Sequence, residues 1–266
     1  DPYISIATID IGGGTTDLVI NEYSLDKGEG GADRSGGGGA YIVPEQRFRD
    51  GFKIAGDDIV LDVIRLVVIP SVIEAFKAAG VSEPDALVSR LMGSESLDAQ
   101  VSVLRQQLTL QVLYPVALRI IKEYEKYDPL EPGNLGVVSV NDLLTDYARP
   151  TPDVLDYVNA AVHRAAGTQA AGFDVLEIGI HINLRRLHEH FVRGEISICK
   201  SLKALSEVIY AYQPDVLLLT GRPSRMPGVL AFVRSLLSLP SGRILPLHQY
   251  KTGPWYPFHK NGRVDD

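Results

Sequence analysis

The chain has 266 residues, with 26 lysines and arginines against 33 aspartates and glutamates, so its formal net charge is −7. A hydrophobic share of 45% excludes wholesale disorder, and the acidic balance gives no basic surface for nucleic acid. No apolar run is long enough to span a membrane, and the start lacks a signal-peptide pattern. We therefore expect a globular protein without a membrane span or a nucleic-acid partner.

The first 52 residues predict three antiparallel strands. Tyr3 to Asp10 alternates as a strand does, Gly12 to Gly14 predicts a tight turn, and Thr15 to Tyr23 predicts the returning strand. A third strand is expected over Ala40 to Phe52, with an irregularity at Pro44. The glycine-rich stretch from Ser24 to Gly39 is expected to be a mobile loop. The chain enters its first strand without an initiator methionine, which we interpret as a fragment of a longer protein.

A helix is expected after Gly56-Asp57-Asp58, where a carboxylate can cap the helix start, and it should bend or restart at Pro70. Several helical stretches between Val81 and Arg164 predict an α-rich insert. The remaining expected elements are a strand over 173–182, helices over 184–192 and 196–212, a buried parallel strand over 215–220, a helix over 227–237 and a strand over 243–247. This order predicts a discontinuous core lobe (1–79 and 173–250), a helical subdomain (80–172) and a tail (251–266).

The most informative segment is Asp10-Ile11-Gly12-Gly13-Gly14-Thr15-Thr16-Asp17. Consecutive glycines expose backbone amides that can bind phosphate oxygens, because no Cβ blocks the approach. A carboxylate at a strand end can hold Mg²⁺ or align water, and the Thr15 hydroxyl can bind a terminal phosphate. The alternative is a glycine-rich hairpin turn with two solvated carboxylates. Two strand patterns flank the segment, which favours the phosphate site.

This segment resembles the second phosphate-binding motif of the superfamily that unites sugar kinases, actin and the seventy-kilodalton heat-shock chaperones. Two later segments resemble further motifs of that superfamily in the same order. Ile54-Ala55-Gly56-Asp57-Asp58 is similar to the element that begins the next helix, and Leu217 to Pro227 is similar to the adenosine motif. The resemblance implies an α/β fold with a ribonuclease-H-like mixed sheet flanked by helices, which corresponds to the second lobe of an actin-like ATPase with an α-helical inserted subdomain.

The resemblance also implies a set of site residues and cofactors. ATP and Mg²⁺ are the implied cofactors, Asp10 and Asp17 the implied catalytic residues, and Asp10 the implied metal ligand. The implied nucleotide-binding residues are Gly12, Gly13, Gly14, Thr15, Thr16, Gly56, Asp57, Gly221, Ser224 and Arg225. Gly56 and Asp57 would lie at a helix N-terminus beside the phosphates, and Arg225 would stack on the base. The sequence departs from the motifs at Ala55, Arg222 and Pro223.

Over nearly the whole chain, the sequence also resembles the bacterial SrfB-type virulence factors, through Asp17 to Tyr23, Phe48 to Ile64, Leu217 to Val229 and Trp255 to Phe258. This resemblance implies the bacterial cytoplasm, although export without a signal peptide stays open, and it implies other virulence-associated proteins as partners. The first lobe of the superfamily, with its own Asp-x-Gly-Thr phosphate loop, has no counterpart in this chain. We therefore expect the missing lobe as a partner and little activity from this half alone.

Two further functions stay open: a non-catalytic scaffold that retains the fold, which the departures at Arg222 and Pro223 favour, and an actin-like polymeriser. Other residues have structural explanations. His188 and His190 lack the spacing of a zinc motif, and Cys199 is expected to be buried in a helix. The charged residues Lys122, Glu123, Glu125 and Lys126 are typical of a solvated helix face. Trp255, Tyr256 and Phe258 are expected to pack against the rest of a longer protein.

Overall fold

The computed structural model describes residues 3–26, 41–93, 98–131 and 135–250, and the backbone of residues 259–260 and 263–264. Most of the loop expected to be mobile, and the aromatic residues Trp255 to Phe258, lie outside these residues. The chain divides into two compact units, residues 1–58 with 190–266, and residues 59–189. The predicted helical subdomain, 80–172, falls within the second unit. The boundary between the units lies inside helix α1 (Gly56–Val63).

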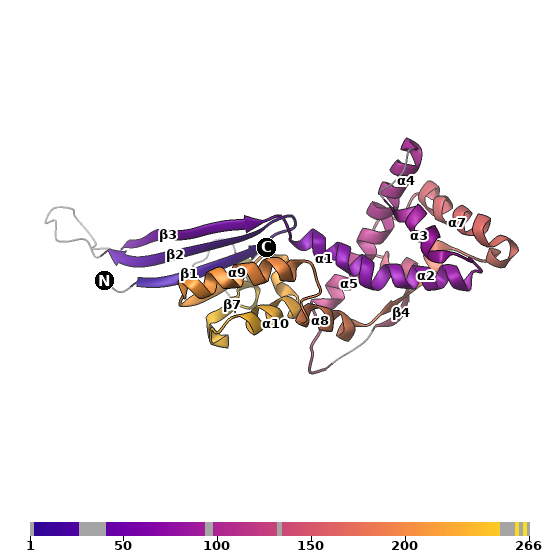
Figure 1. The fold of residues 1–266 in the computed structure, drawn as a ribbon. Helices are drawn as coiled ribbons and strands as arrows, with labels where there is room; N and C mark the ends of the chain where they lie inside the picture. The colour runs from indigo at the N-terminus through magenta and orange to yellow at the C-terminus, as the bar shows by residue number, and fades with distance from the viewer. Residues whose placement is uncertain are drawn as a thin grey trace. The chain divides into compact units, whose positions relative to one another are not determined.

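The first unit contains a five-stranded mixed sheet in the order β3-β2-β1-β6-β7 (Figure 1). The expected antiparallel arrangement of the first three strands is confirmed, and β6 and β7 run parallel to β1. The strands are β1 (Tyr3–Ile11), β2 (Thr16–Asp26), β3 (Tyr41–Phe52), β6 (Val216–Thr220) and β7 (Ile244–Pro246). The strands that carry Asp10 and Thr220 are therefore direct neighbours in this sheet.

Alternation of side chains gives this sheet one buried face. Ala7, Ile9 and Ile11 of β1 are at most 1% exposed, as are Leu18 and Ile20 of β2. Helices α9 (Ile198–Tyr212) and α10 (Pro227–Leu236) lie along this face. The even-numbered residues of β1 point to the opposite face, because successive side chains of a strand alternate. Asp10 is one of them and is exposed.

The irregularity expected at Pro44 lies instead at Arg47. Ile20 pairs with Phe48 and Asn21 with Gln46, so Arg47 is the extra residue of a bulge in β3. Pro44 itself keeps a regular partner, Tyr23. This is compatible with the sheet because β3 is an edge strand, where a residue without an amide hydrogen can face outward.

The second unit is mainly helical. The helix that starts at α1 changes to a π turn over Ile64–Val68 and continues as α2 (Ile69–Ala78). Pro70 lies in the first turn of α2, where its missing amide hydrogen costs least, so the expected change of helix at this proline is confirmed. The other helices are α3 (Pro84–Met92), α4 (Ala99–Leu108), α5 (Tyr114–Tyr124), α6 (Val140–Leu143), α7 (Pro152–Ala166) and α8 (Leu184–Val192), of which α8 ends in the first unit. A second π turn, Thr109–Leu113, joins α4 to α5.

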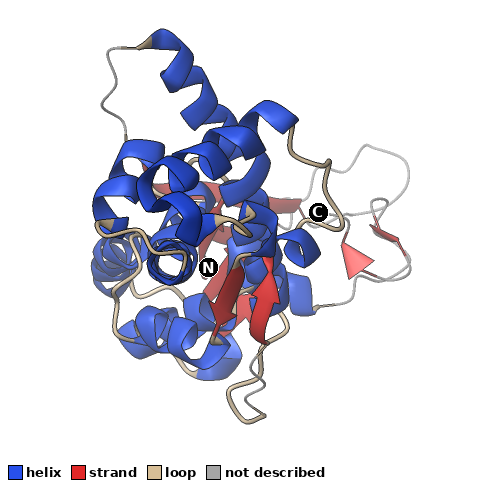
Figure 2. Cartoon of the chain, turned by 90° about the vertical axis from the view of Figure 1, so that its right-hand side faces the viewer, coloured by secondary structure: helices blue, strands red, loops and turns tan. Residues whose placement is uncertain are grey.

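The strand expected over 173–182 is confined to β5 (Gly179–Ile182), which pairs antiparallel with β4 (Gly136–Ser139) in a separate sheet. We did not expect β4, which has only four residues. Two 3-10 turns, Gly167–Ala170 and Val175–Glu177, connect α7 to β5. Figure 2 shows the strands and helices in different colours. In the part of the chain that the structure describes, no helix is both long and apolar enough to cross a membrane.

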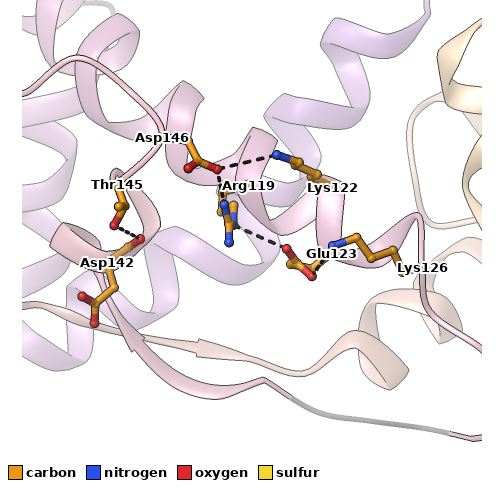
Figure 3. Close-up of polar contacts among 7 residues, drawn as sticks. All are labelled: Arg119, Lys122, Glu123, Lys126, Asp142, Thr145 and Asp146. Carbon is orange, nitrogen blue, oxygen red and sulfur yellow. Dashed lines mark hydrogen bonds and ion pairs between the residues drawn. The ribbon is translucent and has the colours of Figure 1, made fainter.

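Ion pairs join α5 to the segment after α6 (Figure 3). The Arg119 guanidinium contacts Asp146 and, at 3.5 Å, Glu123, while Lys122 lies 3.6 Å from Asp146 and Lys126 3.0 Å from Glu123. These residues include three of the four predicted to form a solvated charged face. Exposed pairs of this kind contribute roughly 0.2–1 kcal/mol each.

Cys199 and His188, which the sequence did not favour as catalytic or metal-binding residues, both have structural roles. The expected burial of Cys199 is confirmed, since the side chain is 2% exposed. The hydroxyl of the buried Tyr124 lies 2.9 Å from Nδ1 of His188. Partial burial of His188 lowers the pKa of its imidazole, and the neighbouring Glu189 opposes this effect.

Candidate functional site

Four residues form a row across the sheet at the end of β1. Asp10 pairs with Asp17 of β2 on one side and with Thr220 of β6 on the other, and Asp17 pairs with Gly51 of β3. Directly paired residues of neighbouring strands project from the same face. The Thr220 hydroxyl donates a 2.7 Å hydrogen bond to Oδ1 of Asp10, and the Thr15 hydroxyl donates a 3.1 Å bond to Oδ2 of Asp17.

The two carboxylates belong to directly paired residues and have no cation beside them in the described ranges. In the described part of the chain, no lysine, arginine or histidine lies within 4.0 Å of either one. Like charges directly opposite each other destabilise a sheet. Such a pair is typical of a functional site, where a ligand compensates an arrangement that the fold alone does not favour.

The loop between β1 and β2 is fixed by its carbonyl oxygens. The Gly12 amide donates to Thr15 O (2.8 Å) and closes the turn. Gly12 O and Gly13 O in turn accept hydrogen bonds from the first amides of α1, those of Gly56 (3.0 Å) and Asp57 (2.8 Å). The carbonyl side of the loop is therefore held against the helix start.

The amide side of the same loop is open. The amides of Gly13 and Gly14 donate to no acceptor within the described ranges, and both residues are exposed. Neither glycine has a positive φ. A Cβ at Gly14 would meet nothing within 4 Å, and one at Gly13 only Asp57 Oδ1 at 4.0 Å. The protein fold therefore does not itself require glycine at either position.

The start of α1 supports the loop. The Asp58 carboxylate accepts a 2.9 Å hydrogen bond from the amide of Ala55, the residue just before α1, as the third residue of a capped helix commonly does. The Thr16 side chain is fully buried, and its hydroxyl donates to Ile54 O at 2.7 Å. Thr16 thus fixes the segment before α1, and its hydroxyl is not on the exposed side of the loop. Gly56 and Asp57 likewise use their amides to hold the loop.

Gly221 brings the segment after β6 against the end of β1. Its φ is +78°, and a Cβ there would lie 2.0 Å from Ile11 O. A side chain at this position is therefore excluded by both strain and overlap. Gly56 is less crowded but still close to its neighbours, with Gly12 O at 3.1 Å and Cγ of Pro223 at 3.2 Å from its ideal Cβ position. The glycine loop, the start of α1 and the segment after β6 are therefore in contact.

The segment that resembles the adenosine motif is a 3-10 turn, Arg222–Arg225. Ser224 is 2% exposed and donates its hydroxyl to Gly221 O at 2.7 Å, so it closes this turn. Pro223 is buried, and Arg222 is exposed. Arg225 is half-buried and already has an interaction partner.

A comparison with protein-family models matches the model described as "Virulence factor SrfB" to residues 1–266. The chain belongs to the SrfB family. The narrower of the two sequence resemblances is thereby confirmed over the full length. No curated protein matches this SrfB-family chain.

The structure brings most of the expected site residues of this SrfB-family chain together, with different roles among them. Asp10, Asp17, Gly13, Gly14 and Thr15 present exposed or half-exposed polar groups. Gly12, Gly56, Asp57, Thr16, Gly221 and Ser224 support the backbone through hydrogen bonds or close packing.

Two neighbours were not among the expected site residues. Thr220 holds the Asp10 carboxylate, and it could have been found as the polar residue that ends an apolar strand. Gly51 leaves room for the Asp17 carboxylate, whose Oδ1 lies 2.6 Å from the ideal Cβ position. No local sequence pattern indicates that Gly51 belongs to the site.

The donor set of the site fits Mg²⁺ only together with a ligand. Within the described residues, no group of three or more histidine, cysteine, aspartate or glutamate side chains could hold a metal. Asp10 and Asp17 supply two hard oxygen ligands, and Mg²⁺ in nucleotide sites is commonly bound by one or two carboxylates, phosphates and water. The site is therefore compatible with a magnesium-nucleotide complex and lacks the ligands of an all-protein metal centre.

Proposed function

We propose that the glycine loop and the two carboxylates bind the phosphates of Mg-ATP, as one half of an actin- or chaperone-like nucleotide cleft. The observation that supports this most directly is the pair of open amides at Gly13 and Gly14 beside Asp10 and Asp17. Their orientation is fixed before any ligand arrives, because the loop carbonyls are bonded to α1. Such preorganised donors bind anions with little reordering.

Each group has a defined part in the proposed complex. The amides of Gly13 and Gly14 donate to phosphate oxygens, and the Thr15 hydroxyl can exchange its bond to Asp17 for a phosphate oxygen. Asp10 and Asp17 hold the metal directly or through water. When bound, Mg²⁺ supplies charge neutralisation for the phosphates. Thr220 positions Asp10 by occupying one of its two oxygens.

The sheet order supports the finer fold assignment. Three antiparallel strands followed by two strands parallel to β1, with helical segments in the crossovers, is the order expected of a ribonuclease-H-like lobe. The site lies where β1 and β6, the two central parallel strands, end. Ligands of open α/β sheets commonly bind at the carboxyl ends of such strands.

The proposed activity needs a second half. Phosphoryl transfer depends on groups that position the nucleotide from both sides, and the sequence contains a single phosphate loop of this type. In a complete cleft, closure around the nucleotide would couple ATP binding or hydrolysis to a conformational change. We expect the chain by itself to bind Mg-ATP weakly and to hydrolyse it slowly.

The rival function is a scaffold that retains this fold without a nucleotide. Pro223 packs against the start of α1, and Ser224 has its hydroxyl bonded internally. Neither residue therefore presents a polar group to an adenosine. This observation favours a degenerate base site, and it leaves the phosphate loop unaffected.

Glycine substitutions separate the two functions. Mg-ATP, Mg-ADP and adenosine are titrated into the chain while the amide NMR signals of Gly13 and Gly14 are followed. We expect saturable shifts with both nucleotides and weaker binding of adenosine. Gly13→Ala and Gly14→Ala should keep the fold and weaken Mg-ATP binding roughly tenfold or more, because a methyl group obstructs the approach to the amides. Asp10→Asn, which removes one carboxylate charge from the site, should also weaken Mg-ATP binding. Its matched control is Glu207→Gln, which removes a charge from an exposed position on α9.

Each outcome decides between the functions. Nucleotide binding that Asp10→Asn and Gly13→Ala weaken, and that Glu207→Gln leaves unchanged, supports the phosphate site. If neither nucleotide shifts the loop signals at concentrations up to roughly 10 mM, which would saturate even a site with a millimolar dissociation constant, the proposal fails and the scaffold is favoured.

A further inference from the structure

A surface pocket in the second unit lies between α3 and α7, which are neighbours in Figure 1. Its volume is about 350 Å³. Leu87 and Leu91 of α3 and Ala161 and Ala165 of α7 form its apolar walls. Arg90, Arg164 and Tyr157 complete the lining. The pocket is open to solvent and combines apolar walls with polar groups, and its volume lies in the range of small-molecule sites.

The side chains of the two arginines have no polar partner in the part of the chain that the structure describes. Neither Arg90 nor Arg164 has a hydrogen-bond or ion-pair partner for its side chain within the described residues, and both are exposed. The chain has seven more acidic than basic residues, 33 against 26, so carboxylates are plentiful. Elsewhere in this unit, Arg119 and Arg185 do find acidic partners.

The usual structural explanation for Arg90 does not apply. An arginine in the last turn of a helix commonly satisfies terminal carbonyls. Here other groups already serve the carbonyls of α3: the Gly93 amide donates to Ser89 O (2.8 Å), and Arg105 donates to Arg90 O through Nε and Nη2 (3.0 and 2.6 Å). The Tyr157 hydroxyl lies 3.4 Å from Leu91 O. The Arg90 guanidinium is therefore available at the rim of the pocket.

We propose that this pocket binds a small amphipathic anion, a carboxylate attached to an apolar body. Arginine is well suited to carboxylates, because its planar donors match the two oxygens. Leu87, Leu91 and Ala161 would contact the apolar body. The volume admits one short chain or ring, which favours a small acid. This site is independent of the proposed nucleotide site, since all of its residues lie in the second unit.

Small probe molecules test separately whether the pocket requires the carboxylate and whether it requires the apolar body. Octanoate is titrated into the full chain, with octanol as the uncharged analogue and acetate as the charge without the apolar body, and amide shifts of the pocket residues are recorded. We expect octanoate to bind saturably and at least about tenfold more tightly than octanol or acetate. Added salt should weaken its binding, because the arginines are exposed.

Variants assign the binding to this pocket. Arg90→Gln with Arg164→Gln should weaken octanoate binding about tenfold, and Arg65→Gln, an exposed arginine of the same unit, should leave it unchanged. Ala165→Phe keeps every charge and should weaken binding by filling the pocket. Urea unfolding of each variant verifies that it is folded. Equal binding of octanol, unchanged binding by the double variant, or no saturable shift with octanoate would each overturn the proposal.

Discussion

The carboxylates of the paired residues Asp10 and Asp17 give the sharpest test of the site without any nucleotide. Because the two residues are directly paired on β1 and β2, their Cβ atoms lie about 4.5–5.5 Å apart, as in other antiparallel pairs. Asp10 is exposed and Asp17 half-exposed, so the charges interact through a largely aqueous medium. Asp10 is bonded to Thr220 on its far side and Asp17 lies against Gly51 on its own far side, so the Coulomb energy is at most about 1 kcal/mol. We expect a repulsion of this size in the folded state.

A double-mutant cycle isolates this repulsion. Asp10→Asn, Asp17→Asn and the double variant are unfolded with urea at low ionic strength and pH 7. Each single variant also changes a hydrogen bond, to Thr220 or Thr15, and the cycle cancels these separate effects. The coupling should be unfavourable by at most about 1 kcal/mol and should shrink in roughly 1 M salt.

A control cycle uses Asp10→Asn with Glu207→Gln. Glu207 is an exposed residue of α9, the helix on the other face of the sheet, so its coupling to Asp10 should be close to zero. If the cycle between Asp10 and Asp17 also gives no coupling, the two carboxylates do not repel each other in the folded protein. A favourable coupling would likewise refute the reasoning, and with it the argument that this pair awaits a cation.

Three further substitutions test the surroundings. Gly221→Ala should destabilise the protein by more than about 2 kcal/mol in urea unfolding, because of its positive φ and the close carbonyl of Ile11; a loss no larger than that of Gly14→Ala would contradict this. Thr16→Val should cost roughly 1–3 kcal/mol by leaving the part-buried carbonyl of Ile54 without its hydroxyl donor, whereas a cost below about 0.5 kcal/mol would show that water replaces the hydroxyl. His188 has a lowered pKa in the folded state, so the unfolded chain binds its proton first, and stability should fall as the pH drops below about 6.5. His188→Asn should flatten that part of the pH profile, and an unchanged slope would exclude His188 as its cause.

The sequence predicted the elements that place the site. Alternation over β1 and β2, and an apolar run before Thr220, were enough to predict the strands that carry Asp10 and Thr220, and the structure shows that these strands pair. Both patterns reflect burial on a sheet, which dominates strand formation. The strand β4 was not predicted, because four residues are too few to show a period.

It was harder to predict which residues of the glycine motif support the backbone and which present exposed polar groups. Thr16 shares its face with Leu18 and Ile20, so alternation alone would have indicated its burial. The bonds from Gly56 and Asp57 to the loop carbonyls join positions far apart in sequence, and no local pattern specifies them. Position in the motif predicted which residues lie near one another, and the backbone hydrogen bonds determine which of them present unpaired polar groups.

The contrast between the crowded glycine after β6 and the open glycines of the loop has an evolutionary consequence. Gly221 cannot change without damage to the fold, whereas Gly14 has free space around its Cα and no positive φ. Replacing such a glycine by alanine can even stabilise a protein, by about 0.4–1 kcal/mol. A lineage under selection for stability alone would therefore drift away from glycine at this position within a few mutational steps. Family members with a bulkier residue at position 14 and glycine still at 221 are the ones in which we expect the ligand, and not the architecture, to have been lost.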